Sequence, residues 1–220
     1  MAKIDLSKYT NVTYINHPLV KHKISIIRSA DMPTNQFRQI IKEISILEGY
    51  EALRNIPTKE KEIVTPIEKT IQPVVDAKSL CFVPILRAGL GMQEGLLELV
   101  PEAVCGHIGI YRDEVTREPK EYFCKLPHDI CSKRVYLLDP MLATGGSAID
   151  AVKQLKQHGA KDITFLCIVA APEGVKAFCE AYPEVPLVVG SLDRELNSDA
   201  YICPGLGDCG DRIFGTLEEK

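Results

Sequence analysis

The stretch Arg134–Gly159, RVYLLDPMLATGGSAIDAVKQLKQHG, decides the fold of this chain. Its apolar run Val135–Leu138 has the length of a buried strand, and Asp139 stands where that strand should end. The small residues of Ala143–Ser147 follow. Apolar residues then recur at helical spacing before a terminal glycine: Ile149, Val152, Leu155. The stretch therefore predicts a strand, a glycine-rich turn and a helix.

This order of elements suits a sugar phosphate. Gly145 and Gly146 let backbone N–H groups approach an anion, and the helix N-terminus adds a partial positive charge. Thr144 and Ser147 add hydroxyl donors. Asp139 can accept hydrogen bonds from two vicinal ribose hydroxyls. Taken alone, an ordinary strand-to-helix turn explains the residues equally well. The lysine of a P-loop and the GxGxxG of a dinucleotide site are both missing.

Composition narrows the class of protein. A chain of 220 residues, 45% hydrophobic and 25% charged, predicts a single globular domain, 1–220, with a sizeable core. The net charge of −4 offers no basic field for nucleic acid, so we expect no nucleic-acid partner. We expect no membrane span and no signal peptide. The eight cysteines form no CxxC and no zinc spacing, so they indicate reduced thiols, the cytoplasm and no protein-held metal.

The remaining pattern alternates strands and helices, which predicts an α/β fold with a parallel-sheet core and crossover helices. Thr34–Ala52 is an amphipathic helix, and Lys59–Val75 predicts a hairpin or edge strands that form a small hood with the N-terminal region. Further strands are expected over these segments: 80–86, 103–112, 121–125, 135–138, 162–170 and 186–191. Further helices are expected at 89–99, after Ser147, and at 173–182.

Three charged residues follow predicted strand ends: Arg87, Arg112 and Asp139. Ligands bind at the carboxyl ends of parallel strands, so these side chains predict one shared site. Arg87, in PILRAGLGM, can grip pyrophosphate oxygens with its planar fork, although a surface ion pair is the simpler alternative. Arg112 precedes two acids, and a solvated loop would have the same sequence there.

The C-terminal stretch YICPGLGDCGDRIFGT, Tyr201–Thr216, contains four glycines and two aspartates. It is too rich in glycine for a regular element, so we expect a loop. Such a loop can wrap a flat base and recognise it with alternating backbone N–H and C=O groups. A glycine-rich surface tail is the alternative.

Several motifs together carry a family resemblance. DPMLATGGS resembles the phosphoribosyl diphosphate (PRPP) motif of the type I phosphoribosyltransferases, with Asp139-Pro140 where many members have two acids. With HPLVKHK, PILRAGLGM, VAAPEG and PGLGDCGDRIFGT, the chain from His17 to Thr216 resembles the uracil-specific family. One departure is Cys209, which stands where that family usually has alanine; we expect activity to survive, with some thiol sensitivity.

The resemblance implies that uracil and PRPP give UMP and pyrophosphate. It implies that PRPP is bound by Arg87, Arg112, Asp139, Pro140, Met141, Leu142, Ala143, Thr144, Gly145, Gly146, Ser147 and Asp208. It implies that uracil is bound by Ile202, Gly207, Asp208 and Cys209, with Asp208 as the catalytic residue. Mg²⁺ would arrive with PRPP rather than in a protein cage. GTP is an expected activator in some members, and a homodimer or higher homo-oligomer is expected.

Two other functions are open from sequence. A regulator that binds UMP and RNA would need a basic RNA-binding face, which the acidic balance disfavours. A transferase acting on a purine or on orotate is disfavoured by the GDCGDRIFGT loop. An RNA-binding assay and a panel of bases separate these alternatives.

Overall fold

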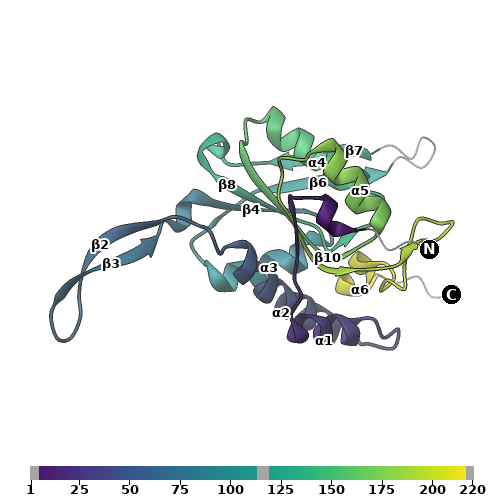
Figure 1. The fold of residues 1–220 in the computed structure, drawn as a ribbon, viewed down its shortest axis with the longest axis horizontal. Coiled ribbons are helices and arrows are strands. Elements are labelled where there is room, and N and C mark those ends of the chain that lie inside the picture. The colour runs from purple at the N-terminus through teal and green to yellow at the C-terminus, as the bar shows by residue number, and fades with distance from the viewer. Residues whose placement is uncertain (1–4, 113–118, 217–220) are drawn as a thin grey trace.

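The structure, a computed structural model, describes residues 5–112 and 119–216. A central sheet lies between two layers of helices (Figure 1). On one side lie α4 (Gly146–Gln157) and α5 (Pro172–Ala181), and on the other lie α1, α2, α3 and α6. The latter helices have these bounds: α1 Pro18–Ile27, α2 Thr34–Ala52, α3 Gly89–Leu99 and α6 Cys209–Phe214.

The sheet is parallel except at one edge. Its strands run in the order β1-β11-β10-β8-β4-β6-β7, with β5 paired to β4 and β9 to β10, and only β7 is antiparallel to its neighbour among the described pairs. The strand bounds are β1 Val12–Tyr14, β4 Leu80–Leu86, β5 Val104–Cys105, β6 His107–Arg112, β7 Pro119–Lys125, β8 Arg134–Leu138, β9 Met141–Leu142, β10 Asp162–Ala170 and β11 Leu187–Leu192. Because β8, β10 and β4 are neighbours and parallel, their carboxyl ends lie at one edge.

Apolar residues fill both faces of the central strands. Along β4, Cys81 and Val83 join the core under α4 and α5, whereas Leu80 and Phe82 join the core under α1 to α3. Side chains alternate along a strand, so a continuous apolar run is what a sheet covered on both faces requires. The predicted α/β fold with a parallel-sheet core is therefore confirmed.

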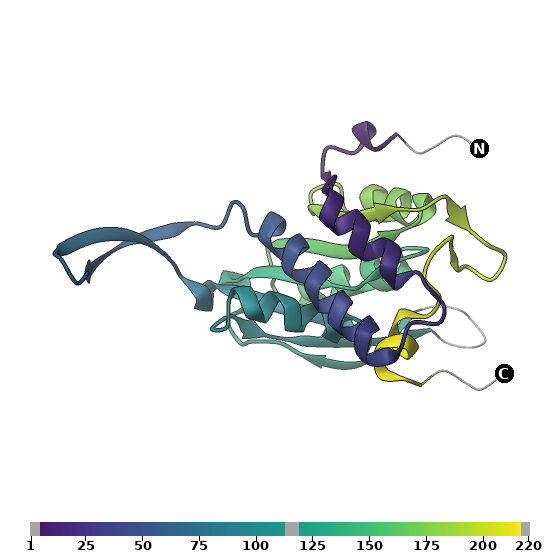
Figure 2. The same ribbon diagram turned by 90° about the horizontal axis from the view of Figure 1, so that it is seen from below.

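A hairpin extends away from this core. The strands β2 (Thr58–Val64) and β3 (Lys69–Val75) pair antiparallel over their whole length, Thr58 opposite Val75 and Val64 opposite Lys69. Figures 1 and 2 both show the hairpin projecting beyond the sheet and its helices. Five of its apolar side chains are exposed: Ile63, Val64, Ile67, Ile71 and Val75.

Most predicted elements are confirmed, and several with the same limits, such as Thr34–Ala52 and Gly89–Leu99. The stretch 103–112 is two strands rather than one, with Gly106 between them. The expectation of no regular element in Tyr201–Thr216 is wrong. That stretch contains β13 (Ile202–Cys203), which pairs with β12 (Glu195–Leu196), and the helix α6.

Candidate functional site

The predicted phosphate loop begins directly after β8. The backbone N–H of Asp139 donates to the Leu166 carbonyl oxygen at 3.2 Å, and its Oδ1 accepts from the Met141 N–H at 3.3 Å. Met141 and Leu142 then pair with β10 as the short strand β9. The first half of the loop is thus attached to the sheet, with the Asp139 carboxylate at the carboxyl end of β8.

The second half of the loop becomes the start of α4. Gly145 has φ +89° and caps the helix, a left-handed conformation that favours glycine. The Gly146 N–H donates to Thr144 Oγ1 at 3.5 Å. Backbone N–H groups in the first turn of a helix lack intrahelical partners, so this end of α4 has the donors that a phosphate needs.

The VAAPEG segment lies against the same loop. A Cβ on Gly174, in the first turn of α5, would collide with the Ala143 carbonyl oxygen and lie 2.7 Å from that of Leu142. Glycine at this position therefore allows α5 to pack directly on the loop backbone. The segment thus supports the phosphate loop, a role that the sequence alone did not indicate.

Arg87 follows β4, the strand next to β8, and lies beside the loop. Its Nη2 is 2.8 Å from Asp211 Oδ1, its Nη1 donates to Thr216 Oγ1 at 3.3 Å, and its guanidinium lies 5.8 Å from the centre of the Phe214 ring. The Thr216 hydroxyl and then Arg87 lower the pKa of Asp211. The PILRAGLGM and C-terminal motifs, far apart in sequence, therefore meet here.

Arg112 is the last residue of β6, two strands from β8 in the sheet order. Its backbone is described, but its side chain and the residues that follow lie outside the part of the chain that the structure describes. Its predicted role stays a prediction.

The C-terminal helix α6 is fixed by local caps. Asp208 is its N-cap, and the Asp208 Oδ1 accepts from the Asp211 N–H at 2.9 Å. Gly215 ends the helix with φ +71°. An aspartate cap and a left-handed glycine are the residues that start and stop a helix. Local signals thus override the glycine content that led us to expect a loop.

Cys209 links this helix to the phosphate loop. Its side chain is buried, and burial followed by the carboxylates of Asp139 and Asp208 raises the pKa of its thiol well above the usual value. Two consequences follow. The start of α6 packs in the same apolar cluster as Leu138 of β8, and the burial of the thiol argues against the expected thiol sensitivity.

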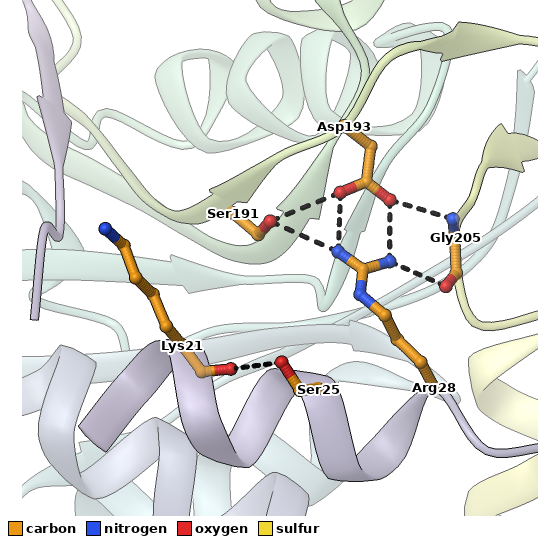
Figure 3. A network of polar contacts seen from close by, with 6 residues as sticks. All are labelled: Lys21, Ser25, Arg28, Ser191, Asp193 and Gly205. Carbon is orange, nitrogen blue, oxygen red and sulfur yellow. Dashed lines mark hydrogen bonds and ion pairs between the residues drawn. The ribbon is translucent and has the colours of Figure 1, made fainter. Parts of the chain in front are cut away.

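The predicted base-binding residues lie on either side of a tight turn. Ile202 is buried at the start of β13, and Gly207, with φ +81°, is exposed just before the α6 cap. Within the turn, Gly205 has φ +60° and is held by Arg28 and Asp193 (Figure 3).

Sequence reasoning did not select Arg28, Asp193 or Arg212, although all three support the C-terminal segment. Asp193 directly follows β11, so the rule that drew attention to Asp139 could have found it. Arg28 carries no such signal, because it acts on a backbone carbonyl far away in the sequence. Arg212 bonds the nearby Leu206 carbonyl as well as the distant one of Ile27.

A cavity of about 450 Å³ lies elsewhere, between β1, the start of α1 and the end of α2; Tyr14, His17, Tyr50 and Arg54 are among its lining residues. None of the predicted site residues lines it. We place the functional site at the strand ends instead, because the charged motifs converge there. Within residues 5–112 and 119–216, no cluster of three or more His, Cys, Asp or Glu side chains could hold a metal. No helix in those ranges is long and apolar enough to cross a membrane.

Comparisons with known proteins agree on one family. A family model described as uracil phosphoribosyltransferase matches residues 14–216. A curated uracil phosphoribosyltransferase from Streptococcus pneumoniae strain R6 is 56% identical over 205 residues, covering 93% of this chain and 98% of that protein. One from Streptococcus sanguinis strain SK36 is 57% identical, covering 92% and 97%. The solved AQ2163 protein from Aquifex aeolicus is 40% identical with a TM-score of 0.90, covering 94% and 100%.

Proposed function

Because the chain belongs to the uracil phosphoribosyltransferase family, we propose that it transfers the phosphoribosyl group of PRPP to N1 of uracil. The bond from the anomeric carbon to pyrophosphate breaks, a bond from that carbon to N1 forms, and the N1 proton leaves. UMP and pyrophosphate are the products. The observation that carries this proposal is the meeting of three motifs. It is seen in the 2.8 Å ion pair from Arg87 to Asp211 and in the close packing of Gly89, where a Cβ would collide with the Leu138 carbonyl oxygen at the end of β8.

PRPP binds, in this proposal, along the loop from β8 to α4. Asp139 accepts from the two ribose hydroxyls, and the loop Ala143–Ser147 surrounds the 5-phosphate with backbone and hydroxyl donors. The left-handed Gly145 and the start of α4 support this role. The phosphate is thereby fixed, which holds the anomeric carbon in one place.

The pyrophosphate end lies toward Arg87, and Arg112 completes this part of the site. The Arg87 side chain is 53% exposed, so its guanidinium can leave the Asp211 carboxylate and bind a ligand oxygen instead. An arginine fork matches pyrophosphate oxygens better than a lysine does. Charge that develops on the leaving group is thereby stabilised.

Uracil binds against Ile202, Gly207, Asp208 and Cys209, through backbone groups that match its donors and acceptors. The Asp208 carboxylate is exposed, and Oδ1 serves the helix cap. It stabilises the positive charge that develops on the ribose, or accepts the N1 proton, so we assign it the catalytic role. The burial of Cys209 supports contact through its backbone rather than its thiol.

Mg²⁺ is proposed to enter with PRPP. The site offers single carboxylates, Asp139 and Asp208, and this donor set fits a cation held mainly by phosphate oxygens and water. When bound, the ion neutralises charge on the departing pyrophosphate.

We also propose a homodimer or higher homo-oligomer in the cytoplasm. The exposed apolar side chains of the β2–β3 hairpin support a contact with a second copy, since such side chains lose contact with water there. Cys81, Cys167, Cys179 and Cys209 are buried free thiols, which supports a reducing compartment. GTP is proposed as an activator on family resemblance alone, and rates with and without GTP test it.

The activity is tested by incubating the protein with PRPP, Mg²⁺ and one free base at a time. We expect UMP with uracil, and no nucleotide with cytosine, orotate, adenine or hypoxanthine. Arg54→Gln is a matched control for Arg87→Gln, because Arg54 is also exposed and paired with an acid, Glu51. It lies just after α2 and lines the separate cavity, which none of the predicted site residues lines. Nucleotide formed from another base, or none from uracil, would reject the proposal.

A further inference from the structure

An ion pair that none of the motifs contains lies beside Gly205 of the base-binding turn, residues 202–208 (Figure 3). Arg28, just after α1, donates from Nη1 to Asp193 Oδ2 at 2.7 Å and from Nη2 to Oδ1 at 2.6 Å. The Ser191 hydroxyl accepts from Arg28 Nη2 and donates to Asp193 Oδ1, each at 3.2 Å. The Asp193 side chain is 3% exposed. Two parallel bonds to a buried carboxylate fix the arginine in one orientation.

The same pair holds both peptide groups of Gly205. Arg28 Nη1 donates to the Gly205 carbonyl oxygen at 2.7 Å, and the Gly205 N–H donates to Asp193 Oδ2 at 2.8 Å. A Cβ on Gly205 would collide with the Ile202 carbonyl oxygen. The turn between Ile202 and Gly207 is therefore defined by side chains that come from the end of α1 and from the end of β11.

The next carbonyl is held as well. Arg212 donates from Nη1 to the Leu206 carbonyl oxygen at 2.6 Å and to that of Ile27 at 2.8 Å. Its guanidinium lies 4.2 Å from the centre of the Phe37 ring. Two consecutive carbonyls of the turn, those of Gly205 and Leu206, thus accept hydrogen bonds from buried or half-buried arginines.

These hydrogen bonds determine the direction in which the backbone N–H groups of the turn point. In a trans peptide the C=O and the following N–H point in opposite directions, and the peptide bonds after Gly205 and Leu206 are trans. The carbonyl of Leu206 faces Arg212, so the N–H of Gly207 points away from it. Uracil has two carbonyl oxygens that accept hydrogen bonds, and a fixed N–H donor is what their recognition requires.

We propose that Arg28 and Asp193 are positioning residues that set the affinity and selectivity for the base, through Gly205, and leave PRPP binding unchanged. This inference rests on the proposed function, because it assumes that the turn binds uracil. The phosphate loop is attached to β10 and α5 instead, and none of its described hydrogen bonds involves this pair. An ion pair that only stabilises the fold would affect both substrates alike.

The test measures kcat and the two KM values in Arg28→Lys and Asp193→Asn. Lysine can reach Asp193 or Gly205 but cannot bond both as the fork does. The amide introduced by Asp193→Asn would still accept from the Gly205 N–H but would leave Arg28 without its counter-ion. We expect KM for uracil to rise about tenfold in Arg28→Lys and more in Asp193→Asn, the scale of one lost charged hydrogen bond. KM for PRPP should change by less than about twofold.

Glu43→Gln is the matched control. Glu43 pairs with Lys23 between α1 and α2, is likewise partly buried, and touches no part of the base-binding turn. It should lower the melting temperature without changing KM for uracil. If Asp193→Asn does not fold, the same KM values are measured in Arg28→Lys and Ser191→Ala.

The outcomes separate this inference from the proposed function. A wild-type protein that forms no UMP overturns the proposed function. An active wild type whose Arg28→Lys and Ser191→Ala variants raise both KM values equally, or neither, overturns the positioning role. A selective rise in KM for uracil, with a smaller ratio of uracil to cytosine turnover, supports it.

Discussion

The two loops that meet at the candidate site are held in place by different means. The phosphate loop, 139–147, is attached by its own backbone to β10 and continues directly into α4. The base-binding turn, 202–208, is held by side chains from distant elements: Arg28 lies 177 positions before the Gly205 that it binds. The first loop is thus held mainly by backbone pairing in the sheet, whereas the second depends on side chains from distant elements.

The difference extends to charge. In our proposal, the phosphate loop presents the Asp139 carboxylate and the N–H groups of the first turn of α4 to PRPP. In and around the base-binding turn most charged side chains bind other parts of the protein. Arg28 pairs with Asp193, Arg212 donates to backbone carbonyls, and Asp208 caps α6. Uracil is a neutral molecule, so a segment that recognises it needs oriented backbone groups rather than net charge.

The largest effect is expected at Asp208, where the two loops come together. Asp208→Asn keeps an oxygen that can cap α6, as Asp208 does toward the Asp211 N–H, but removes the negative charge. We expect kcat/KM to fall about 100-fold, the scale of losing one electrostatic stabiliser of a transition state, with an unchanged melting temperature. Steady-state rates and thermal denaturation measure both. Wild-type kinetics would remove Asp208 from the mechanism.

The next largest effect is expected at Asp139, where a substitution should change the KM for only one of the two substrates. Asp139→Asn keeps the shape of the side chain and its bond from the Met141 N–H, but offers a ribose one neutral oxygen in place of two charged ones. We expect KM for PRPP to rise roughly 30-fold, the cost of weakened charged hydrogen bonds, and KM for uracil to stay near the wild-type value. Initial rates over a grid of PRPP and uracil concentrations give the two KM values. Equal changes in both KM values would contradict the assignment of one substrate to each loop.

The same contrast explains what the sequence could predict. Apolar periodicity and glycine positions are local, so they located β8, the glycine-rich turn that follows it, α4, and the helices at Thr34–Ala52 and Gly89–Leu99. The family resemblance, which depends on whole motifs, then implied the reaction. Periodicity, glycine positions and motifs all involve residues that are close together in the sequence, so they can be recognised from the sequence alone.

The supports of the base-binding turn were not predictable in the same way. Arg28 looks like an ordinary polar residue at the end of a helix, and its role exists only because α1, β11 and the turn pack together. Glycine content hid α6, since the Asp208 and Gly215 caps that define it were taken as parts of a loop. Long-range hydrogen bonds to backbone groups leave no periodic pattern in the chain.

A smaller effect is expected at Arg87, which connects the regions through Asp211 and Thr216. Arg87→Lys keeps the charge but loses the planar fork, so we expect kcat/KM to fall about tenfold and inhibition by pyrophosphate to weaken. Arg54→Lys is the matched control, because Arg54 is also an exposed arginine that pairs with an acid, Glu51. Unchanged values for both PRPP and pyrophosphate would show that Arg87 does not bind the leaving group.

A stability prediction concerns the helical layer that carries the base-binding turn. Glu48 in α2 is fully buried, and neither carboxylate oxygen has a hydrogen-bond partner among the described residues. A Cβ on Gly190, next to Ser191, would collide with this carboxyl group, so glycine makes room for it. Burial raises the pKa of Glu48 well above its usual value of 4.5, so the folded protein favours the neutral acid.

The sign of the pH dependence follows. A raised folded-state pKa contributes stability that is fully present below the unfolded value of 4.5 and is lost as pH rises toward the folded value. Wild type should therefore lose about 1.4 kcal/mol for each pH unit above roughly 5, relative to Glu48→Met, until the folded pKa is reached. Urea denaturation at pH 5, 6 and 7 measures this. A difference between the two proteins that does not depend on pH would contradict a neutral Glu48.

The smallest effect is expected at Cys209, where the family resemblance leads us to expect alanine. Cys209→Ala removes one sulfur atom from a buried site lined by apolar residues, so the free energy of unfolding should fall by about 1 kcal/mol or less. If uracil is bound through the backbone at this position, kcat/KM should change by less than about threefold. The buried thiol, with its raised pKa, should also resist alkylation in the native protein, whereas the exposed Cys131 should react. Peptide mapping after alkylation and steady-state kinetics with uracil measure both. A large loss of activity in Cys209→Ala, with PRPP binding intact, would mean that the thiol itself contacts the base, and the turn would then recognise uracil through a side chain as well as its backbone.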